Sequence, residues 1–68
     1  MNIMVENIGI DAGKVWTKLE EKGRMNVRDL RNAIKVTERD AFAALGWLAK
    51  EGKVTIEKDG RDFYVELS

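Results

Sequence analysis

Cysteine, histidine and proline are all absent from this 68-residue chain. The lack of cysteine excludes disulfides, and the lack of both cysteine and histidine excludes the common zinc sites. Catalytic schemes in which histidine or cysteine serves as base or nucleophile are excluded for the same reason. We therefore expect a protein that is not an enzyme and that needs no metal or cofactor.

Long apolar runs are also missing. No stretch approaches the roughly 20 apolar residues that a membrane-spanning helix requires, and the N-terminal MNIMVENIG lacks the basic start of a signal peptide. The sequence contains no linker-like or repeated segment. These absences predict one cytoplasmic domain over residues 1–68, with no membrane partner, and nothing in the sequence implies a small-molecule ligand.

The charge balance is even overall and uneven locally. Twelve Lys and Arg residues offset twelve Asp and Glu residues. Between Lys22 and Arg39, however, six basic residues face two acidic ones, a local balance of 6 − 2 = +4. The other fifty residues must then sum to −4. A basic segment of this kind indicates either a phosphate-binding surface or a solvated helix face.

The first half of the chain has the apolar period of helices. The pattern predicts a helix over about residues 8–22, ended by Gly23 and with Trp16 packed into the core. Because Gly9 and Gly13 disfavour a helix by about 1 kcal/mol each, we expect its start between Asn7 and Ala12.

Two shorter helices are expected next. Asn26 is a suitable N-cap for a helix over about residues 27–35, and Thr37 for a helix over about 38–51. The apolar stripe of the latter contains Ala41, Leu45 and Leu48.

After Gly52 the apolar period changes to two, which is typical of strands. Strands are expected over about residues 53–58 and 62–67, joined by a tight turn at Asp59-Gly60. A short extra strand near residues 24–26 would pair with this hairpin. Three helices followed by a hairpin predict an α+β fold, the winged helix-turn-helix.

Two segments carry a family resemblance. Ala12-Gly13-Lys14-Val15-Trp16 and Ala44-Leu45-Gly46-Trp47-Leu48-Ala49-Lys50-Glu51 resemble a family of small stand-alone prokaryotic winged helix-turn-helix proteins of unknown function. The resemblance covers nearly the whole chain. It implies the same fold, and DNA binding by analogy with other winged helices.

Double-stranded DNA is the partner that this fold predicts, in a transcription-regulator-like role. The expected contacts divide into three groups: backbone contacts from Arg24, Arg28, Arg31 and Lys35, groove contacts from Arg39 and Lys50, and a wing contact from Arg61. The outward positions of the third helix offer few groups for base readout. We therefore expect binding led by the phosphate backbone, with weak sequence preference.

The alternative is a protein-interaction or dimerisation module. Ala43, Gly46 and Trp47 occupy outward positions of the third helix and form a flat surface with one aromatic anchor. The indole of Trp47 is expected either to pack over the wing on Tyr64 or to contact a protein partner or a second copy of the chain. Phe42 is expected either in the core or at its rim.

Overall fold

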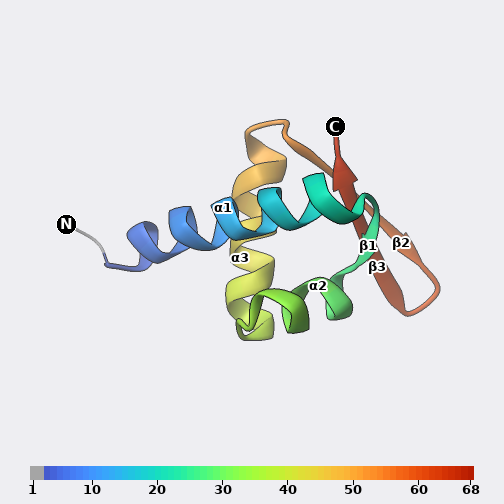
Figure 1. Cartoon of the computed structure of the whole chain (residues 1–68), viewed down its shortest axis with the longest axis horizontal. Helices are drawn as coiled ribbons and strands as arrows, with labels where there is room; N and C mark the ends of the chain where they lie inside the picture. The colour runs from blue at the N-terminus through green and yellow to red at the C-terminus, as the bar shows by residue number, and fades with distance from the viewer. Residues whose placement is uncertain (1–2) are drawn as a thin grey trace.

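The structure is a computed structural model that describes the backbone of residues 3–68 and the side chains of residues 7–68. Its elements follow the order α1 (Ile3–Lys22), β1 (Met25–Asn26), α2 (Val27–Ile34), α3 (Glu38–Lys50), β2 (Val54–Asp59) and β3 (Asp62–Leu67). The strands form one antiparallel sheet in the order β1-β3-β2. Figure 1 shows α1 crossing α3, with α2 below it and the hairpin at one end. The expected α+β fold, including the short strand β1, is confirmed.

The core lies where the three helices meet the sheet. Leu19 of α1, Leu30 of α2, Leu45 of α3 and Val65 of β3 are almost completely buried there. Within residues 7–68 the buried side chains are all apolar. Each element thus contributes one apolar face to a single core, as a small domain without disulfides requires.

Local capping confirms the predicted boundaries between the helices. Asn26 Oδ1 accepts a hydrogen bond from the Arg28 backbone N–H at 2.8 Å, and Thr37 Oγ1 accepts one from Asp40 N–H at 3.1 Å. These bonds satisfy backbone donors that have no partner inside a helix. Gly23 ends α1 with φ of 78°, a backbone conformation that favours glycine.

The predicted start of α1 is wrong. The helix begins at Ile3 and runs unbroken through Gly9 and Gly13, before the predicted window of residues 7–12. A glycine weakens a helix by about 1 kcal/mol but does not end it. Once Val15 and Leu19 are packed on the core, each added residue gains a backbone hydrogen bond, and the helix extends.

The core position predicted for Trp16 is also wrong, because its side chain is 38% exposed. The buried arc of α1 is centred on Ala12, Val15 and Leu19. At 100° per residue, Trp16 projects about 70° from that centre. Its indole therefore lies at the rim of the core and on the surface of the molecule.

Lys35 ends α2 in a left-handed conformation, with φ of 57°. This conformation is unfavourable for residues other than glycine. We expect Lys35→Gly to stabilise the fold by about 0.5–1 kcal/mol and to raise Tm by about 3–6 °C, as measured by thermal unfolding followed by circular dichroism. Lys14→Gly is the control: it places glycine at an exposed position inside α1 and should lower Tm. Equal changes in the two variants would contradict the strain at Lys35.

The wing, defined here as the β2–β3 hairpin, has a continuous register from Val54 opposite Leu67 to Asp59 opposite Asp62. Gly60, with φ of 64°, forms the turn between the strands. At the base of the wing, Phe63 packs edge-to-face on Phe42 of α3, with ring centroids 5.7 Å apart. Phe42 thus lies at the rim of the core, and this aromatic contact fixes the wing against the helices.

Candidate nucleic-acid interface

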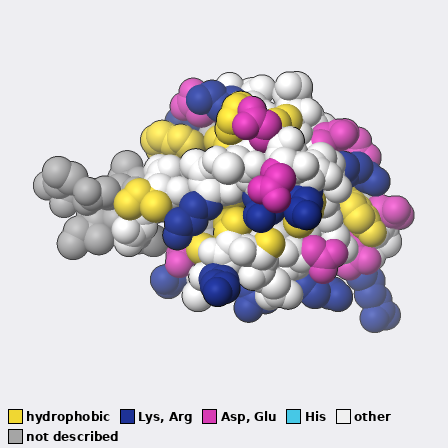
Figure 2. All heavy atoms as spheres, in the orientation of Figure 1, with side chains coloured by type: hydrophobic (Ala, Val, Ile, Leu, Met, Phe, Trp, Pro, Cys, Tyr) yellow, Lys and Arg dark blue, Asp and Glu magenta, His cyan; other side chains and the backbone are white. Residues whose placement is uncertain are grey.

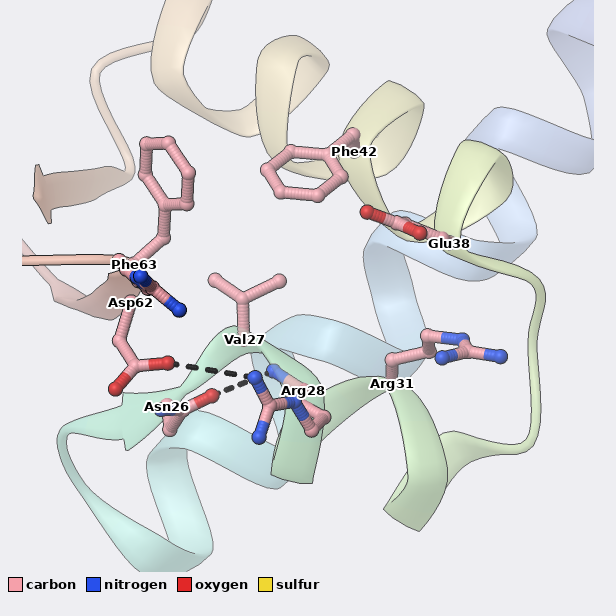
Figure 3. A pocket seen from close by; sticks show the side chains of 9 residues that line it. Asn26, Val27, Arg28, Arg31, Glu38, Phe42, Asp62 and Phe63 are labelled. Atoms are coloured by element: carbon pink, nitrogen blue, oxygen red, sulfur yellow. Dashed lines mark hydrogen bonds and ion pairs between the residues drawn. The ribbon is translucent and has the colours of Figure 1, made fainter.

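A cavity of about 290 Å³ lies between α2, the start of α3 and the wing. Three of the seven predicted DNA-binding residues line it: Arg28 and Arg31 from α2, and Arg61 from the turn of the wing. Figure 3 shows the rings of Phe42 and Phe63 on one side of this cavity, with Arg28 and Arg31 on the other. The fold therefore brings together arginines that lie up to 33 residues apart in the sequence.

Arg28 is the most accessible of the cavity's ion-paired groups. Its side chain is 72% exposed, and its Nη2 lies 3.5 Å from Asp62 Oδ1 of the wing. An ion pair this exposed contributes at most about 1 kcal/mol. An incoming phosphate oxygen can therefore replace Asp62 at small cost and form a stronger charge-assisted contact.

Arg31 lines the cavity and also stabilises the turn between α2 and α3. Its Nε donates a hydrogen bond to the Val36 carbonyl oxygen at 3.3 Å, and the Val36 backbone N–H bonds back to the Arg31 carbonyl oxygen. These two bonds hold the turn between α2 and α3. A substitution at Arg31 would therefore change the turn as well as the charge of the surface.

Arg24 lies outside the cavity, on the sheet. Its guanidinium carbon stacks 4.4 Å from the centre of the Tyr64 ring, and Nη2 lies 3.5 Å from Glu57 Oε2. Tyr64 and Glu57 are opposite one another across β3 and β2. The ring predicted as one possible neighbour of Trp47 thus carries Arg24 instead.

The remaining basic candidates are spread over α2 and α3. Lys35 is exposed at the end of α2. Arg39 and Lys50 are exposed at opposite ends of α3, eleven residues and therefore about 17 Å apart. Arg39 Nε lies 3.7 Å from Asp40 Oδ1. The outward positions between Arg39 and Lys50 include Ala43 and Gly46, which carry no polar side-chain group for reading a base edge.

The three predicted protein-binding residues differ in exposure. Ala43 is partly buried, whereas Gly46 and Trp47 are exposed. The buried stripe of α3 is centred between Ala44 and Leu45 rather than on Leu45, which turns Trp47 toward α1. Trp47 is 42% exposed and lines a second hollow together with Trp16.

The lining of the cavity carries a small positive formal charge. The cavity lining contains three arginines and two carboxylates, Glu38 and Asp62, so its formal charge is 3 − 2 = +1. Figure 2 shows basic side chains along the lower edge of the molecule, over α2 and the wing, with acidic groups beside them. The other basic residues of the segment, Lys22, Arg24, Lys35 and Arg39, do not line this cavity.

Sequence reasoning missed Asn26, Glu38 and Asp62 as members of this site. The contact of Asp62 with Arg28 depends on how the wing folds back on α2. The period of apolar residues along the chain does not predict a contact between such distant segments. The Asp59-Gly60 turn was the one available signal, since it places Asp62 at the start of β3.

Three helices in which α2 and α3 are joined by a short turn, followed by a hairpin that packs beside them, define a winged helix-turn-helix protein. The chain belongs to the family described as "Winged helix-turn-helix domain (DUF2582)", whose model matches residues 1–67. This confirms the resemblance seen in the sequence. The family description names the fold and no ligand.

A solved structure supports the same fold. The solution NMR structure of protein BT2368 from Bacteroides thetaiotaomicron is 31% identical to this chain, with a TM-score of 0.81. The match covers 91% of this chain and 76% of that one. No curated protein matches the chain. Within the described part of the chain, no helix has the length and hydropathy needed to cross a membrane.

Proposed function

We propose that this protein binds double-stranded DNA in a transcription-regulator-like role, mainly through the phosphate backbone. The observation that carries the proposal is the convergence of Arg28, Arg31 and Arg61, from two separate elements, around one cavity beside α3. In DNA-binding winged helices α3 enters the major groove, while α2 and the wing contact the flanking backbone. The arginine cluster lies between α2 and the wing, where such backbone contacts are required.

The chemistry of α3 supports weak sequence preference. Arg39 and Lys50 are long enough to reach base edges or phosphates, but they lie about 17 Å apart. The positions between them, at Ala43 and Gly46, provide no hydrogen-bonding side chain. Binding would therefore depend on charge and on the shape of the duplex more than on base identity.

A binding role is also consistent with the absence of the common catalytic residue types. Histidine and cysteine, the residues that most often act as base or nucleophile near neutral pH, are absent. We include in the proposal that the protein is not an enzyme, and that its function depends on what the surface recognises.

The test is a charge-reversal pair at the cavity. Arg28→Glu with Arg61→Glu should weaken binding to a random-sequence duplex at least about tenfold, because two phosphate contacts become repulsive. Arg31 is left intact, since it holds the turn before α3. Fluorescence anisotropy with a labelled duplex at low salt measures the affinity, and circular dichroism verifies that the variant is folded.

The matched control is Lys14→Glu with Lys18→Glu on α1, which changes the net charge by the same −4 without touching the cavity. Binding should fall much less in this variant. Equal losses in the two variants would mean that only net charge matters, and the proposed site would then be wrong. Absence of binding by the native protein at low salt would contradict the function itself.

Protein binding through the outer face of α3 is the second candidate, and the exposure of Trp47 is the observation that favours it. Trp47→Ala should then abolish the protein contact while the domain stays folded and its affinity for DNA is unchanged. Unfolding of this variant would show that Trp47 has a structural role.

A further inference from the structure

Two exposed tryptophans lie beside one hollow on the face formed by α1 and α3. Trp16 is 38% exposed and Trp47 is 42% exposed, and both line a cavity of about 380 Å³ with Gly9 and Gly13. Ile10, about 120° from Trp16 around the axis of α1, is 55% exposed and does not line this hollow. Of the five large apolar side chains exposed among residues 7–68, the remaining two, Phe42 and Phe63, pack on each other. Trp16 and Trp47 therefore form an exposed apolar surface that has no such partner; we call it the tryptophan face.

In the first half of α1, the described side chains are exposed or only partly buried before Ala12. Among residues 7–22 of α1, the buried ones are Ala12, Val15 and Leu19, and none of residues 7–11 is buried. Figure 1 shows this half of the helix projecting beyond α3. A short helical segment containing two glycines is marginal in water without packing.

We propose that a second copy of this chain covers the tryptophan face, in a two-fold dimer whose α1 helices cross antiparallel. Gly9 and Trp16 lie two turns apart on the same side of α1. A two-fold axis between Ala12 and Gly13 places each indole of Trp16 over Gly9 of the other copy. Each Trp16 indole then fills the space beside Gly9 of the other copy. The contact occurs twice, once on each side of the axis, as an isologous interface requires.

The glycines make this close approach possible. A Cβ added at Gly9 or at Gly13 would meet no atom within 4 Å, so both positions are open to a partner. The α1 residues on the side of Trp16, a strip from Gly9 to Thr17, are uncharged, and Lys53 is the one charged residue among residues 7–68 that lines the hollow. An interface centre poor in charge avoids the desolvation of unpaired groups.

Two features favour a second copy over an unrelated partner. The formal net charge of zero means that two copies do not repel each other overall. The strip is also self-complementary, since it contains both the glycine hollow and the indole that fits it. Its limited extent, about 12 Å of helix axis between Gly9 and Thr17 plus Trp47, corresponds to the lower end of interface sizes. We expect a micromolar dissociation constant.

The tryptophan face and the arginine cavity share no lining residue. A dimer formed through α1 would therefore leave Arg28, Arg31 and Arg61 of both copies accessible. The dimer does not depend on the proposed DNA binding, and the two are tested with different variants.

The test is sedimentation velocity from about 5 to about 500 µM, a range that brackets a micromolar constant. The native protein should shift from monomer to dimer as concentration rises. Gly13→Glu should raise the dissociation constant at least about tenfold, because it buries a carboxylate between the helices. In the monomer the same change meets no atom and improves helix propensity, so Tm at low concentration should not fall.

Asn32→Glu on α2 is the matched control, since Asn32 is exposed and the change in charge is the same. It should leave the dimer intact. A native protein that remains monomeric up to 500 µM would overturn the proposal and would leave the tryptophan face to another protein. A dimer that tolerates Gly13→Glu as well as Asn32→Glu would overturn it too, because its interface would lie elsewhere.

Discussion

Raising the salt concentration from 50 to 200 mM is expected to weaken duplex binding by about 10²-fold. Each neutralised phosphate contributes about −0.9 to the slope of log K against log salt. Four phosphate contacts among the five basic groups that line the cavity or lie at the ends of α3 would give a slope of about −3.6. A fourfold rise in salt concentration then lowers the binding constant by about 10²-fold. These groups are Arg28, Arg31, Arg39, Lys50 and Arg61. Fluorescence anisotropy at four or more salt concentrations measures the slope.

Arg61→Ala tests whether the wing takes part in this contact. Arg61 is exposed, follows Gly60 in the tight turn, and lines the arginine cavity. Its removal should reduce the slope by about 1 and weaken binding to all sequences alike. Lys58→Ala, on β2 of the same hairpin but outside the cavity, is the control and should leave the slope nearly unchanged. If the native protein gave a slope of log K against log salt near zero, binding through the phosphate backbone would be contradicted.

Leu45→Ala is expected to remove half or more of the stability of the fold. Leu45 is completely buried in α3 and belongs to the core formed by all three helices and the sheet. Truncation of a buried leucine costs about 2–5 kcal/mol, because the lost contacts leave a cavity. A 68-residue domain has a total stability of roughly 3–10 kcal/mol. Urea unfolding followed by circular dichroism measures the change.

Leu67→Ala provides the comparison at a partly buried site. Leu67 packs against the edge of the same core, at the end of β3. The same atoms are removed, but the site is open to solvent and can relax, so we expect about 1 kcal/mol. Equal losses at Leu45 and Leu67 would contradict a core centred on α3.

Sequence periodicity was most informative where a local pattern alone determines structure. Asn26 and Thr37 were identified as N-caps from residue type and position, and both accept the expected hydrogen bonds. Asp59-Gly60 predicted the turn of the wing, because the left-handed backbone there favours glycine. Capping and tight turns involve residues two to four positions apart, so the sequence contains all the necessary information.

The same reasoning was wrong where the outcome depended on what packs against a residue. Because of Gly9 and Gly13, the first helix was expected to begin between Asn7 and Ala12, yet α1 begins at Ile3. Trp16 was assigned to the core, yet it lies at the rim. Both errors have the same cause. Propensity and periodicity predict which side of a helix a side chain lies on, but they do not predict how far the neighbouring elements extend over that side.

By itself, the sequence determined the class of the fold, the order of its elements and the exclusion of histidine and cysteine chemistry. Those properties follow from composition and from patterns within a few residues. Only the tertiary structure decided that Asp62 neutralises part of the charge of Arg28 and that Trp16 and Trp47 share one exposed face. Each of these contacts joins segments 31 or more residues apart, and such contacts exist only after the helices and the wing have packed on a common core.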